Sequence, residues 1–114
     1  MMSEMKDKPI AQVLAEFMTS RKFENLPKET IDKAKQYAID LAGCIVGASK
    51  EPQAQALLDV MKEEGGSPHS SVFSQGFKTS VMNAALINGT MGHVFDFDDD
   101  HREGTMHPSV AVFP

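Results

Sequence analysis

The chain contains very little cysteine, and this limits how it can be stabilised. Its one cysteine, Cys44, cannot form a disulfide within the chain, and such sparing use fits a reducing cytoplasm. Residues 1–8 lack the apolar core of a signal peptide. The longest apolar stretch, 38–48, is interrupted by Asp40 and is far shorter than the roughly 20 residues of a membrane span. We therefore expect a soluble cytoplasmic protein whose residues 1–8 are disordered.

Basic charge is also scarce, which excludes several classes of partner. The formal net charge is −5, the pI is about 5.2, and no run of lysine or arginine occurs. Phosphate backbones and anionic lipid surfaces attract clustered positive charge. We therefore expect neither nucleic acid nor a membrane as a partner.

Apolar residues recur at helical spacing along most of the chain. The pattern predicts helices over residues 9–20, 27–47, 51–64 and 80–93. Residues 21–26 are expected to form a linker, and residues 70–73 a short extended segment. The hydrophobic fraction of 41% is that of a folded protein. The predicted fold class is all-α, with about four helices and at most one short strand over residues 9–114.

Two apolar segments lead to further expectations. Residues 41–48 are apolar nearly all round, which predicts burial on more than one side, with Cys44 in the core. Gly43 and Gly47 would let a second helix approach closely. Residues 110–114 are apolar and uncharged, and an uncovered apolar end predicts that more protein or a partner lies against it.

One segment concentrates the residues that can do chemistry. Four aspartates and three of the four histidines lie between His93 and His107. Packing like charges together costs free energy unless cations, metals or hydrogen-bond donors offset them. The segment therefore suggests a functional site, whose base would be a histidine or an aspartate.

The arrangement resembles the MmgE/PrpD family, which includes 2-methylcitrate dehydratase, cis-aconitate decarboxylase and iminodisuccinate epimerase. The matching motifs are Asn88-Gly89, His93, Asp96-Phe97-Asp98-Asp99 and His107-Pro108-Ser109. The likeness extends over residues 10–114. The resemblance implies that this is the N-terminal part of the large helical domain of a longer, two-domain enzyme. Members remove a proton next to a carboxylate of a di- or tricarboxylic acid, then expel water or CO2, or reprotonate the other face.

The resemblance also implies roles for individual residues. Asp96 and His107 would be catalytic, while His93 and Asp99 would support the site. Asp100 stands where the family usually has threonine, so a hydroxyl donor to substrate is replaced by an acceptor. No cofactor is expected. A homodimer or a complementary C-terminal polypeptide is the expected partner, because the lysines and the further histidine of such a site would lie beyond Pro114.

Two other interpretations compete with this one. Asp96, Asp98 and Asp100 alternate as oxygen ligands of Ca²⁺ or Mg²⁺ sometimes do. The EF-hand pattern is incomplete, however, and imidazole is a softer ligand than those ions favour, so no metal is expected. The chain could instead be a non-catalytic helical module or a subunit of a split protein. The block alone, with Arg102 as its nearby cation, would repel an anionic substrate, which predicts that the isolated chain is inactive.

Overall fold

The computed structural model describes residues 8–114, so the predicted disorder of residues 1–8 falls almost wholly outside it. Contacts between residues divide the chain into two compact units, which meet within one helix between Lys33 and Ala34. Each unit is described by itself. In the described part of the chain, no helix has both the length and the apolar character that crossing a bilayer requires.

The first unit begins with the amphipathic helix α1 (Ile10–Ser20). Pro9 precedes it, as expected for a residue that has no N–H to donate. The predicted linker contains one turn of 3₁₀ helix, η1 (Phe23–Asn25). The next helix, α2 (Lys28–Ala48), starts as predicted at Pro27, whose carbonyl accepts its first hydrogen bond from the Ile31 amide at 3.2 Å.

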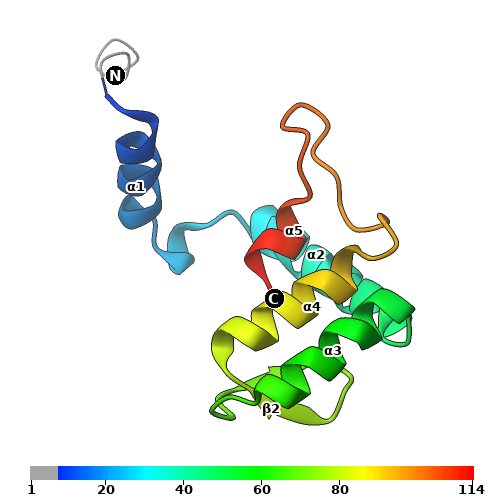
Figure 1. Cartoon of the computed structure of the whole chain (residues 1–114). Coiled ribbons are helices and arrows are strands. Elements are labelled where there is room, and N and C mark those ends of the chain that lie inside the picture. Colours follow the sequence, from blue (N-terminus) through cyan, green and yellow to red (C-terminus); the bar gives the residue numbers. More distant parts are fainter. Residues whose placement is uncertain (1–7) are drawn as a thin grey trace. The chain divides into compact units, whose positions relative to one another are not determined.

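The second unit holds the remainder of α2 and the rest of the chain (Figure 1). Its elements are α3 (Pro52–Glu64), β1 (Ser70–Val72), β2 (Phe77–Thr79), α4 (Val81–His93) and α5 (Pro108–Val112). The prediction of a mostly helical protein is confirmed. The predicted extended segment is β1, which forms an antiparallel hairpin with β2. Both β2 and α5 are too short for their periodicity to appear in the sequence.

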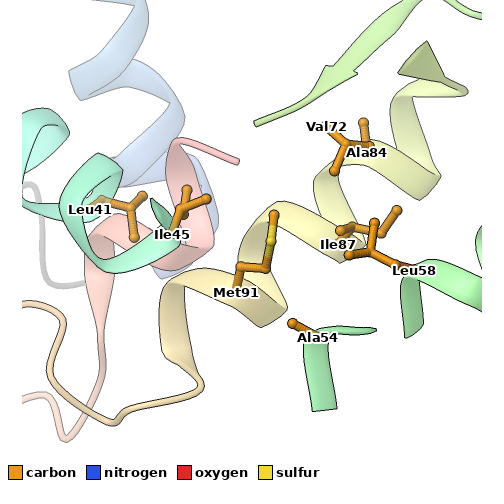
Figure 2. Packing of buried hydrophobic residues seen from close by; sticks show 8 residues of the cluster. All are labelled: Leu41, Ile45, Ala54, Leu58, Val72, Ala84, Ile87 and Met91. Carbon is orange, nitrogen blue, oxygen red and sulfur yellow. The ribbon is translucent and has the colours of Figure 1, made fainter. Parts of the chain in front are cut away.

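Helix α4 lies at the centre of this unit. It contacts α3, α5 and both strands. Figure 2 shows the buried residues of α4 together with those of α2, α3 and β1. The cluster comprises Leu41, Ile45, Ala54, Leu58, Val72, Ala84, Ile87 and Met91. Burial of these apolar side chains stabilises the unit from which the loop after α4 extends.

Two expectations about the end of α2 are wrong. Val46 is 51% exposed, Gly43 is also exposed and Cys44 is only partly buried, so the segment is buried on one face and not on several. Only that face carries residues of the core cluster. A Cβ on Gly43 would meet no atom within 4 Å, so no helix approaches it. The close approach occurs instead at Gly92 of α4, where a Cβ would lie 2.7 Å from the Leu41 side chain.

Asn88, the first residue of the Asn-Gly motif, has a structural role. Its side chain is buried, its Oδ1 accepts a hydrogen bond from the Phe73 amide at 2.9 Å, and its Nδ2 donates to the Ser71 carbonyl at 3.2 Å. These bonds give partners to two backbone groups at the end of β1. Asn88 thereby fixes the strand hairpin to α4.

Candidate functional site

The loop between α4 and α5 folds back on itself and brings the motif residues together. At its tip, the His101 amide donates to the Met106 carbonyl at 2.9 Å, forming an isolated antiparallel bridge. His101 also accepts a hydrogen bond through Nδ1 from the Gly104 amide at 2.9 Å. Because the two arms run antiparallel from this bridge, the aspartates before the tip lie beside the histidine after it.

Asp98 occupies the middle of the site. Its side chain has no exposed surface, and its Oδ1 lies 2.9 Å from His93 Nδ1 and 3.3 Å from His107 Nδ1. The contact with His93 has hydrogen-bond geometry, whereas the contact with His107 does not. His107 Nδ1 is therefore buried without a hydrogen-bond partner, and so is the other carboxylate oxygen of Asp98, Oδ2. The two imidazoles meet edge to face, with centroids 4.6 Å apart.

Asp96 lies on the other side of His107. Its Oδ1 is 3.5 Å from His107 Nε2, and its side chain is 80% exposed. The Asp96 backbone has a φ of 51°, in the left-handed region. Aspartate tolerates this region better than most residues, but at some cost in free energy. Strained backbone of this kind is concentrated at functional sites, where it aims a side chain.

The two supporting aspartates differ from each other. Asp99 is half-buried, and its Oδ1 accepts a hydrogen bond from the Ser109 amide at 3.1 Å, which satisfies a free N–H at the start of α5. Asp100 is exposed, and the ion pairs of the described residues do not join it to Arg102. His93 forms a hydrogen bond with Asp98.

A pocket lies beside this loop. It has a volume of about 330 Å³ and is lined by Tyr37, by Asp99, Asp100 and His101, and by residues of α5. A second pocket of about 230 Å³ is lined by residues of α2, by Phe73 and Asn88, and by Phe113 and Pro114 at the end of the chain. Asp96 and His107 line neither of these two pockets.

The acidic loop acts electrostatically on α2. Burial raises the pKa of the Cys44 thiol above its ordinary value, and the negative charges of Asp40, Asp98 and Asp99 raise it further. A raised pKa keeps the thiol protonated at neutral pH, and a protonated thiol is a poor nucleophile. The surroundings of Cys44 therefore disfavour the thiolate, which is the nucleophilic form.

Asp98 is the residue whose importance could not be found from the sequence. It stands in a run of acids, and the resemblance assigned roles to Asp96 and Asp99 on either side of it but none to Asp98 itself. No local signal separates a buried aspartate from its exposed neighbours, because the burial comes from the return of the chain at His101. The geometry as a whole offers an exposed carboxylate and an imidazole for proton transfer, with a buried carboxylate behind them.

Known proteins share sequence with this chain, including the loop between α4 and α5. The model of the MmgE/PrpD N-terminal domain matches residues 12–114. Cis-aconitate decarboxylase-like protein oryM of Aspergillus oryzae (strain ATCC 42149 / RIB 40) is 25% identical over 104 residues. That alignment covers 89% of this chain but only 21% of the relative. No solved structure was found to match. Since the family model covers nearly the entire chain and includes the whole of the aspartate and histidine loop, the chain belongs to the MmgE/PrpD family.

Proposed function

We propose that this chain supplies Asp96 and His107 to the active site of a lyase or isomerase that acts on a di- or tricarboxylic acid. The observation that carries the proposal is the 3.5 Å contact between Asp96 Oδ1 and His107 Nε2. The Asp96 carboxylate is exposed and stands on strained backbone, and the partly exposed His107 imidazole lies next to it. The cis-aconitate decarboxylase-like relative carries a related sequence over the same region.

The chemistry that this pair supports is proton transfer at the carbon next to a carboxylate. One group removes the proton, and the electron pair of the C–H bond delocalises into the neighbouring carboxylate as an enolate. The second group donates a proton to the departing hydroxyl, which leaves as water, or to the opposite face of the same carbon, which gives an epimer. Such acid–base pairs contribute about 10²–10⁴-fold to a rate.

An enolate also needs positive charge or N–H donors, which this loop hardly provides. Four aspartates stand beside one arginine, Arg102. We propose that cations from outside these 114 residues complete the site, and that His93 and Asp99 support it from this side. The isolated chain would then be inactive. Asp100, at the neighbouring pocket, would disfavour a substrate carboxylate that a threonine hydroxyl would bind.

The first test is the mass of the native polypeptide that carries this sequence. If it is several times 12.5 kDa, that protein is incubated in D2O with di- and tricarboxylic acids, and deuterium uptake next to each carboxylate is followed by NMR. Asp96→Asn tolerates the left-handed backbone equally well and is expected to lower exchange by about 100-fold or more.

His107→Gln should lower exchange similarly, whereas His69→Gln, at an exposed histidine before β1, should leave it unchanged. Exchange that persists in both Asp96→Asn and His107→Gln would show that neither residue moves the proton. Turnover by the isolated 114-residue chain would refute the proposal that its site is incomplete.

An alternative is a non-catalytic module or one subunit of a split protein. The exposed apolar side chains of α5 and the residue after it favour this: Val112 is 76% exposed and Phe113 47%. A native mass near 12.5 kDa, with association that depends on concentration and no substrate exchange, would support the alternative. Sedimentation velocity of wild type and of Val112→Glu distinguishes specific association from aggregation.

A further inference from the structure

Asp98 contacts His107 at the ring nitrogen that does not face Asp96. Asp98 Oδ1 lies 3.3 Å from His107 Nδ1, whereas Asp96 Oδ1 lies 3.5 Å from His107 Nε2. The Asp98 side chain has no exposed surface, so a substrate cannot touch it. Any influence of Asp98 on proton transfer must therefore pass through His107.

Two polar atoms at this contact, Asp98 Oδ2 and His107 Nδ1, are buried without a hydrogen bond. Buried polar atoms in native proteins nearly always have a partner, so each exception calls for an explanation. The terminal torsion of an aspartate side chain has a broad energy well, so a small turn of the carboxylate can align an oxygen with Nδ1. Hydrogen bonds at catalytic groups are often poorly aligned until a ligand binds. The two residues are therefore the best partners for each other's unpaired atoms.

We propose that Asp98 is a positioning residue that keeps a proton on His107 Nδ1. A carboxylate only accepts hydrogen bonds, so the imidazole nitrogen that faces it has to donate. The proton that His107 transfers then enters and leaves at Nε2, the nitrogen that faces Asp96. A buried aspartate fixes the tautomer and the orientation of a catalytic histidine in this way in the serine proteases. Asp98 has this role only if His107 transfers protons, so the inference rests on the proposed function.

His93 holds Asp98 in place from the end of α4. Its Nδ1 is hydrogen-bonded to Asp98 Oδ1 at 2.9 Å, and its ring meets the His107 ring edge to face. His93 is the last residue of α4, whose Ile87 and Met91 belong to the buried cluster. A continuous series of contacts thus runs from a packed helix through His93 and Asp98 to His107. Support of this kind locks a catalytic side chain in one geometry.

The test is a two-bond ¹H–¹⁵N correlation spectrum of the labelled 114-residue chain, at a pH where the imidazoles are neutral. His93 and His107 should both carry their proton on Nδ1. His101 should show the opposite tautomer and serves as a reference, because its Nδ1 accepts a hydrogen bond from the Gly104 amide. Asp98→Asn should move the His107 proton to Nε2, because the asparagine amide can donate to Nδ1. Asp59→Asn, the same change at an exposed carboxylate of α3, should leave every tautomer unchanged.

The same variant has an expected effect on activity. In the deuterium-exchange test of the native polypeptide, Asp98→Asn should lower exchange about as much as His107→Gln, by about 100-fold or more. Circular dichroism shows whether the variant is folded. A folded Asp98→Asn chain in which His107 keeps its proton on Nδ1 would mean that the role of Asp98 is structural only. Unchanged exchange in a variant whose His107 tautomer has reversed would overturn the inference too.

The wild-type spectrum decides the question if Asp98→Asn does not fold. A neutral His107 with its proton on Nε2 would overturn the inference without any variant, and it would leave the proposed function standing. Exchange that persists in His107→Gln would instead refute the proposed role of His107 in proton transfer, whatever the tautomer. The two failures are therefore distinguishable.

Discussion

Charge and burial at single residues determine what the acidic loop can do. Asp98 is fully enclosed while Asp96, two residues earlier, is 80% exposed. Neighbouring carboxylates thus acquire different roles from their surroundings alone, one facing solvent and the other facing two imidazoles. The same loop reaches Cys44, whose pKa it raises in addition to the larger effect of burial.

Cys44 allows a test of its own surroundings, in which burial and Asp40 of α2 act more strongly than the loop. Its raised pKa means that the reactive thiolate appears at higher pH than in an ordinary thiol. The rate of alkylation by iodoacetamide, followed against pH, should therefore have its midpoint above that of the same chain unfolded in urea. Asp40→Asn should move the midpoint down, because Asp40 is the largest charge effect.

Asp59→Asn, at an exposed carboxylate on α3, is the matched control and should leave the midpoint where it is. A folded chain that reacts with the same midpoint as the unfolded one would show that neither burial nor the nearby carboxylates raise the pKa of this thiol.

Asn88 carries a second prediction at this scale. Asn88→Ala leaves the Phe73 amide and the Ser71 carbonyl without their side-chain partner. The free energy of unfolding should fall by about 1–3 kcal/mol, because two partly buried hydrogen bonds are lost, each contributing about 0.5–1.5 kcal/mol. Urea unfolding of the chain measures it, with Asn25→Ala, at an exposed asparagine in η1, as the control. Equal midpoints for the two variants would contradict the structural role of this motif residue.

Elements differ in how far the sequence determines them. Apolar spacing predicted α1, α2, α3 and α4 with boundaries close to those observed, because each is long enough to show its period. It missed β2 and α5, which have three and five residues. The contacts of Asp98 could not be predicted from the sequence either, because they depend on the chain reversal at His101 and on the start of α5.

The packing of α4 on α2 explains why glycine stands at position 92. A Cβ there would lie 2.7 Å from Leu41 Cδ1 and 3.1 Å from Val110 Cγ2. Leu41 is 2% exposed and has little room to move away. Gly92→Ala should therefore lower the free energy of unfolding by about 1–3 kcal/mol, as overpacking does. Urea unfolding monitored by circular dichroism measures the difference.

Gly43→Ala is the matched control on the partner helix. A Cβ at Gly43 meets nothing within 4 Å, and alanine is the better helix former by about 0.5–1 kcal/mol. This variant should be more stable than wild type. If both alanine variants changed stability in the same direction, the assignment of Gly92 as the close-contact glycine would be wrong.

At the scale of the whole molecule, the buried core belongs to the second unit. Its members run from Leu41 to Met91, whereas α1 has no buried residue. Hydrophobic stabilisation follows the apolar area removed from water, so α1 contributes little of it to this chain. A chain that begins at residue 21 should therefore unfold at nearly the same urea concentration as the full chain. Its free energy of unfolding should differ by no more than about 0.5 kcal/mol, the usual effect of changes at exposed positions.

The slope of the urea transition gives the deciding measurement, because it scales with the surface exposed on unfolding. An unchanged midpoint with a slightly smaller slope would mean that α1 adds surface but no packed core. A clear drop in midpoint would show that the exposed apolar residues of α1, such as Ile10 and Phe17, find a partner in the folded chain.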